Sequence, residues 1–78
     1  MRILVVDDER MIVRGLTHIL GELALDWVTA IDGTTSPGDA VAAAREKPPD
    51  IVITDIRMKE MDGFTLIQRL RREVAPLA

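Results

Sequence analysis

The sequence has no cysteine, no excess of basic residues and no long apolar run, and each absence excludes a class of protein. Without cysteine, neither a disulfide framework nor a thiolate zinc site is possible. The net charge of −3 at pH 7 means that the chain lacks the excess of positive charge by which proteins bind nucleic acid. The apolar stretch at residues 3–6 ends at two aspartates and is too short for a signal peptide or a membrane span. We therefore expect a soluble cytoplasmic protein.

The length allows one domain at most. A chain of 78 residues buries only about 60–65% of its unfolded surface on folding. The apolar share of 47% and the charged share of 29% are ordinary for a globular chain. There is no internal repeat, low-complexity segment or linker, so residues 1–78 are expected to form a single domain.

Apolar runs predict three strands. Residues 2–7 and 51–55 contain continuous aliphatic runs rich in β-branched residues, which is typical of strands covered on both faces. Residues 27–31 are predicted as a shorter strand that begins at Trp27 and ends at Asp32-Gly33, a turn signal.

Helical spacing separates these strands. Residues 9–24 carry an apolar face at steps of three or four residues, formed by Ile12, Leu16, Ile19, Leu20 and Leu23. A second helix is expected to begin with Ser36 as N-cap, Pro37 at the first helical position and Asp39 in a capping box, and to stop before Pro48-Pro49.

A last helix is predicted over about residues 63–74, after the turn Met61-Asp62-Gly63. Its apolar positions are Phe64, Ile67, Leu70 and Val74. The resulting order, β-α-β-α-β-α, predicts an α/β fold with a parallel sheet and helices on both faces.

Three carboxylates mark the candidate site. In an open parallel sheet, ligands bind beyond the C-terminal ends of the strands, where the strand order reverses. If the first strand lies between the other two, Asp7, Asp8 and Asp55 meet at that point. Two unit charges about 4 Å apart repel by roughly 4 kcal/mol at an effective dielectric constant near 20, so a divalent cation is expected among them.

The type of ligand atom indicates which cation. Carboxylate oxygens, with no sulfur and no well-placed histidine, favour Mg²⁺ over zinc. Asp55 is then a candidate nucleophile toward a phosphoryl group, with positioning and charge neutralisation as the contributions of the site.

The segments VVDDER and ITDIRMKEMDG, with the spacing between them, closely resemble the receiver domain of two-component response regulators. The resemblance implies a flavodoxin-like fold and transfer of a phosphoryl group from a sensor histidine kinase to Asp55. It also implies Mg²⁺ held by Asp8 and Asp55, by Asp7 through water, and by the backbone carbonyl of Arg57. Gly63 matches the glycine of the family turn, whereas Lys59 stands where many members have proline.

The resemblance covers the whole chain but only about the first two-thirds of a receiver domain. Only the first three βα units are expected, without the switch Ser/Thr and the lysine that follow in the family. The chain is accordingly interpreted as a truncated or partial receiver. Its third strand would then be a sheet edge without charge, proline or bulge, and we expect self-association through it or partial order.

The sequence allows two alternatives to a phosphoryl acceptor. One is a non-catalytic truncated receiver that acts as an oligomerisation or interaction module. The other is a phosphatase of the haloacid dehalogenase type, which resembles Asp-x-Asp-x-Thr at the nucleophile. Arg57 occupies the place of its second aspartate and argues against that class. Met58 and Met61 flank the site and are interpreted as loop packing rather than a partner surface.

Overall fold

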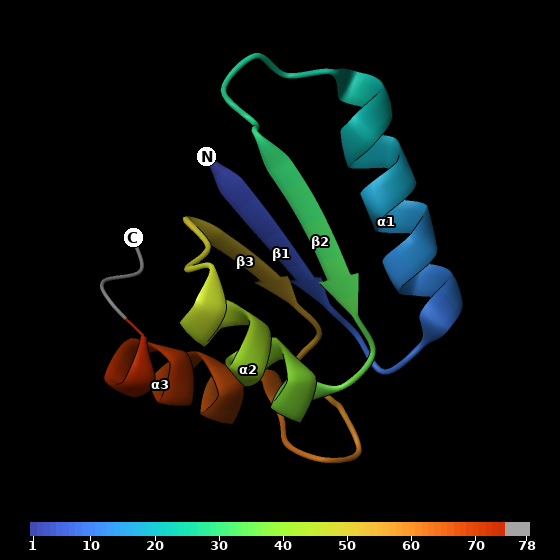
Figure 1. Cartoon of the computed structure of the whole chain (residues 1–78). Coiled ribbons are helices and arrows are strands. Elements are labelled where there is room, and N and C mark those ends of the chain that lie inside the picture. The colour runs from blue at the N-terminus through green and yellow to red at the C-terminus, as the bar shows by residue number, and fades with distance from the viewer. Residues whose placement is uncertain (75–78) are drawn as a thin grey trace.

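The computed structural model describes residues 1–74, which form three strands alternating with three helices (Figure 1). The strands are β1 (Arg2–Val6), β2 (Ala30–Thr34) and β3 (Ile51–Thr54). The helices are α1 (Arg10–Leu23), α2 (Pro37–Glu46) and α3 (Gly63–Glu73). This confirms the predicted element order. Residues 75–78, where the sequence was expected to stop short of a fourth strand, lie outside the described part.

The strands form a parallel sheet in the order β2-β1-β3. Ile3 of β1 pairs with Ile31 of β2 and with Ile51 of β3, so these three isoleucines lie side by side across the sheet. β1 is almost completely buried because it has a strand on each side and helices on both faces. The central position expected for the first strand is confirmed.

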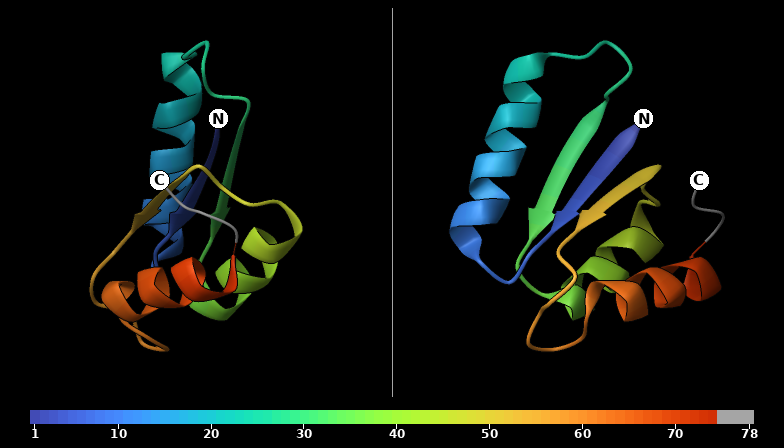
Figure 2. Two further views of the ribbon diagram at one scale, coloured as in Figure 1. Left: turned by 90° about the vertical axis from the view of Figure 1, so that its left-hand side faces the viewer. Right: turned by 180° about the vertical axis from the view of Figure 1, so that it is seen from behind.

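The helices cover the two faces of the sheet unequally (Figure 2). α2 and α3 lie together on one face, and α1 lies alone on the other. The main core belongs to the first of these faces and consists of Leu4, Val6, Ala40, Val41, Ala44, Leu66, Leu70 and Val74. Small residues on α2 let this helix approach the sheet closely.

Two predicted apolar faces need correction. On α1, Val13 is the buried residue, while Ile12, Ile19 and Leu23 remain 43%, 56% and 57% exposed. Their stripe is exposed because α1 packs only on the sheet within residues 1–74. On α3, Phe64 is 67% exposed and Leu66 is fully buried in its place, because Leu66 lies one turn before Leu70 on the face toward α2.

The second strand was predicted three residues too early. Asp32 and Gly33 are part of β2, and Trp27 lies before it, half exposed. Asp32 and Gly33 do not form the predicted turn, because tertiary contacts favour an extended backbone at these residues. The Arg2 guanidinium donates to the Asp32 carboxylate at 2.8 Å, and a Cβ on Gly33 would lie 2.5 Å from the Val13 side chain.

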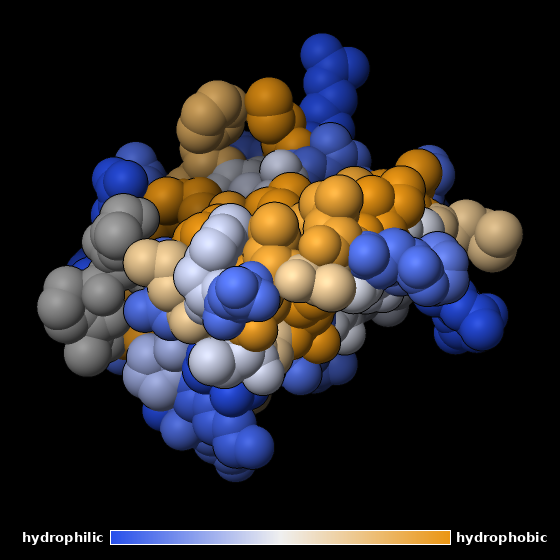
Figure 3. All heavy atoms as spheres, turned by 90° about the horizontal axis from the view of Figure 1, so that it is seen from above, coloured by the Kyte–Doolittle hydropathy of each residue, from blue (hydrophilic) through white to orange (hydrophobic). Residues whose placement is uncertain are grey.

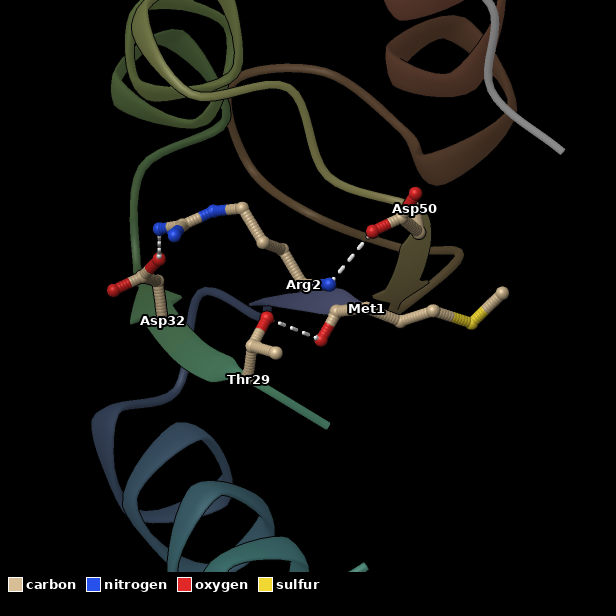
Figure 4. Close-up of polar contacts among 5 residues, drawn as sticks. All are labelled: Met1, Arg2, Thr29, Asp32 and Asp50. Atoms are coloured by element: carbon tan, nitrogen blue, oxygen red, sulfur yellow. Dashed lines mark hydrogen bonds and ion pairs between the residues drawn. The ribbon is translucent and has the colours of Figure 1, made fainter. Parts of the chain in front are cut away.

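The start of the sheet is fastened by polar contacts (Figure 4). The backbone N–H of Arg2 donates to the Asp50 carboxylate at 2.7 Å, and the backbone N–H of Asp50 donates to the Arg2 carbonyl at 2.9 Å. On the other side, the Met1 carbonyl accepts from the backbone N–H and the hydroxyl of Thr29. These contacts fix both neighbours of β1 in register.

Candidate functional site: a carboxylate cluster at the strand ends

The three predicted acids lie together at the C-terminal ends of β1 and β3. Asp7 and Asp8 follow β1, Asp55 follows β3, and the backbone N–H of Asp55 donates to the Val6 carbonyl at 3.1 Å. One carboxylate oxygen from each of the three acids lies within 4.8 Å of the others. The parallel register of β1 and β3 thus brings Asp55 into one cluster with two acids that are far from it in the sequence.

Backbone donors orient each carboxylate. Asp7, which is only 8% exposed, accepts from the backbone N–H of Glu9 at 2.9 Å. Asp8 accepts from the backbone N–H of Lys59 at 3.3 Å. The exposed Asp55 accepts from the backbone N–H of Ile56 at 2.8 Å. Each contact uses one of two carboxylate oxygens, and Asp55 is the most accessible of the three acids.

The loop between β3 and α3 closes tightly beside Asp55. The backbone N–H of Gly63 donates to the Ile56 carbonyl at 2.7 Å. A Cβ at position 63 would lie 2.3 Å from the Asp55 carbonyl oxygen, which no real side chain tolerates. Glycine is therefore required for the loop to return to the strand end, which agrees with the expectation for Gly63.

Lys59 acts through its backbone. Proline has no N–H, so a proline at this position would lack the donor that Lys59 gives to Asp8. The departure from the family pattern therefore adds a contact between the loop and the acids. The sequence did not reveal this contact, because any non-proline residue supplies the same donor.

Asp62 was predicted only as part of a turn, yet it caps α3. Its carboxylate accepts from the backbone N–H of Thr65 at 2.7 Å, and this hydrogen bond is the largest of the effects that lower the pKa of Asp62. An aspartate directly before a helical pattern was the available signal.

Met58 and Met61 are partly buried against the α2–α3 core, so packing is their role here.

The donor set fits a hard divalent cation. Three carboxylates supply oxygen only, and the site keeps one exposed side, as Mg²⁺ requires because it retains several waters. Arg57 lies in the exposed loop two residues after Asp55, and its carbonyl remains a predicted ligand. Concentrating three acids without a cation costs Coulomb energy, so binding one stabilises the arrangement.

The family model for the response regulator receiver domain matches residues 3–77. The chain belongs to this family. The receiver domain thus extends over nearly all of the sequence, and the acidic cluster lies where a phosphoacceptor site of a two-component response regulator is expected.

The chain is similar in sequence to parts of two larger proteins. A protein-glutamate methylesterase/protein-glutamine glutaminase of Anaeromyxobacter dehalogenans is 42% identical over 88% of the chain, which spans 19% of that protein. The alkaline phosphatase synthesis transcriptional regulatory protein PhoP of Bacillus subtilis is 35% identical over 92% of the chain, which spans 28% of that protein.

A solved structure shows the same fold. A two-component transcriptional regulator AraC from Clostridium phytofermentans superposes with a TM-score of 0.82 at 35% identity, covering 92% of this chain and 57% of that one. The flavodoxin-like receiver fold of three βα units is therefore confirmed. No helix within residues 1–74 is both long enough and apolar enough to cross a membrane.

Proposed function

We propose that this receiver domain accepts a phosphoryl group on Asp55 from a sensor histidine kinase, with Mg²⁺ in the carboxylate cluster. The observation that carries the proposal is the meeting of an exposed Asp55 with Asp7 and Asp8 within 4.8 Å. Asp7, Asp8, Asp55 and the Arg57 carbonyl would hold the cation. When bound, the cation neutralises charge on the transferring phosphoryl oxygens.

The step is a displacement at phosphorus. A carboxylate oxygen of Asp55 forms the new O–P bond while the N–P bond of the phosphohistidine breaks, and the leaving imidazole takes a proton from solvent. The Ile56 N–H holds the second carboxylate oxygen of Asp55, which fixes the attacking oxygen in one direction. The exposure of Asp55 lets a large donor reach it. We propose that this step belongs to a two-component signalling protein of the cytoplasm.

Acetyl phosphate tests the proposal without a kinase. The purified chain is incubated with acetyl phosphate and Mg²⁺ and weighed intact. We expect a mass gain of one phosphoryl group that hydroxylamine removes, as it does from acyl phosphates. Asp55→Asn should abolish the gain and Asp8→Asn should reduce it, whereas Asp26→Asn, an exposed aspartate outside the cluster, should keep it. An unchanged gain in Asp55→Asn would refute the assignment.

A second candidate function, an interaction module, is favoured by a separate observation. Within residues 1–74, β3 pairs with β1 alone. In addition, α1 has apolar side chains that lie exposed on its surface. Figure 3 shows one end of the molecule, where apolar side chains reach the surface among hydrophilic ones. Failure of phosphorylation together with a concentration-dependent oligomer would support this function over the first.

A further inference from the structure

The tip of the loop between β3 and α3 contacts two other parts of the molecule through neighbouring residues. The backbone N–H of Lys59 donates to Oδ2 of Asp8 at 3.3 Å, although the two residues are 51 positions apart in the sequence. The carboxylate of the next residue, Glu60, accepts from the hydroxyl of Ser36, the N-cap of α2, at 3.4 Å. The loop tip therefore bridges the carboxylate cluster and the N-terminus of α2.

The residues on either side hold this tip in place. Met58 and Met61 are partly buried against the core that α2 and α3 form with the sheet. The Lys59 side chain, by contrast, is exposed. The direction of the Lys59 N–H toward Asp8 is thus set by the path of the loop, and it does not depend on what the lysine side chain contacts.

The donor to Asp8 differs in origin from the donors to the other two acids. Oδ1 of Asp7 accepts from the N–H of Glu9, two residues later, and Oδ1 of Asp55 accepts from the N–H of the next residue, Ile56. Both of these donors belong to the backbone that carries the acid itself. The hydrogen bond to Asp8 comes from another loop and depends on the residue at position 59, because proline there would have no N–H to give.

The number of oxygens that a carboxylate presents distinguishes one hard cation from another. Mg²⁺ demands an octahedral shell, keeps several waters and uses one or two carboxylates. Ca²⁺ takes about six to eight oxygen ligands, and carboxylates that bind through both oxygens help to supply them. To bind in this second way, Asp8 has to turn its Oδ2 away from the Lys59 N–H. The loss of that hydrogen bond counts against Ca²⁺.

We propose that the backbone N–H of Lys59 is a positioning group that keeps Asp8 as a one-oxygen ligand and so makes the cluster prefer Mg²⁺ to Ca²⁺. This inference rests on the proposed function and deepens it, since it concerns the cation of the same site. The lysine side chain has no part in the preference. Both cations carry the same charge, so the ammonium group of Lys59 repels them alike.

Calorimetric titration of a matched pair of variants tests the preference. Lys59→Pro and Lys59→Ala both lose the ammonium group, but only Lys59→Pro loses the N–H. Mg²⁺ and Ca²⁺ are titrated separately into the wild type and both variants at one ionic strength. We expect the ratio of the Ca²⁺ to the Mg²⁺ dissociation constant to fall about fivefold in Lys59→Pro, through the loss of one hydrogen bond, and to stay within about twofold of the wild type in Lys59→Ala.

The outcomes separate this inference from the proposed function. An unchanged ratio in Lys59→Pro, or an equal fall in both variants, overturns the role of the N–H while the cation site stands. Binding of neither cation by the wild type overturns the cation site and this inference together. The acetyl phosphate experiment reports independently whether Asp55 accepts a phosphoryl group.

Amide hydrogen exchange of the wild type, followed by NMR, keeps the inference testable if Lys59→Pro fails to fold. With saturating Ca²⁺, the Lys59 N–H should exchange at least about fivefold faster than with saturating Mg²⁺, because Asp8 turns away from it. The N–H of Thr65, which donates to the Asp62 carboxylate outside the cluster, is the matched control and should exchange equally with both cations. Equal exchange of the Lys59 N–H with the two cations overturns the proposal.

Discussion

Gly33 shows how one absent side chain sets the distance between α1 and the sheet. A Cβ at this position would lie 2.5 Å from Val13 and 3.0 Å from Thr17, both on the face of α1 toward β2. We expect Gly33→Ala to destabilise the fold by about 1–3 kcal/mol through overpacking. Gly15→Ala, where nothing lies within 4 Å, should instead stabilise it by up to about 1 kcal/mol. Urea unfolding of both variants checks the opposite signs, and equal effects would contradict the close approach.

Asp62 gives the stability a defined dependence on pH. The Thr65 N–H lowers the pKa of Asp62 below its ordinary value of 3.8, so the unfolded chain binds this proton first as the pH falls. Its contribution is full above 3.8 and is lost as the pH falls through the lower native pKa. Asp62→Asn can still cap the helix but does not titrate. In thermal melts, the difference in melting temperature between the wild type and Asp62→Asn should therefore change with pH only in this acid range. A difference that shifts near neutral pH would contradict the assignment.

At the scale of elements, β1 and β3 could be predicted because both are continuous apolar runs ended by acids. The rule for parallel sheets places Asp7, Asp8 and Asp55 together once β1 lies between the other two strands, an order that the resemblance to receiver domains implied. β2 was predicted three residues too early, because Asp32 and Gly33 signal a turn locally but are held in a strand by pairing with β1, by Arg2 and by packing against α1. The apolar face of α3 was wrong at Phe64 because helical periodicity alone does not say which of two neighbouring stripes meets another helix.

Only half of the capping box predicted at the N-terminus of α2 is present in the structure. The Ser36 hydroxyl accepts from the Asp39 N–H at 3.3 Å, but the Ser36 N–H donates to the Thr34 hydroxyl, so the reciprocal half of the capping box is supplied by β2. Ser36→Ala should cost about 1 kcal/mol of unfolding free energy. Ser36→Asn, another good N-cap, should retain most of it. Chemical denaturation compares the two, and equal losses would show that the cap does not act through its side-chain acceptor.

For the molecule as a whole, the carboxylate cluster should make stability depend on Mg²⁺ in a way that a neutral variant reverses. Without the ion, three close acids repel one another, so Asp8→Asn should raise the melting temperature in a chelator. With Mg²⁺ at about 100 times its dissociation constant, the wild type should gain about 2.7 kcal/mol, because the ion binds only the folded chain. Asp8→Asn should gain much less, and the order of the two melting temperatures should invert. Thermal melts of both proteins with chelator and with Mg²⁺ measure this crossing, and Asp26→Asn should follow the wild type throughout. Parallel responses of wild type and Asp8→Asn would mean that the acids gather at the strand ends without forming the cation site.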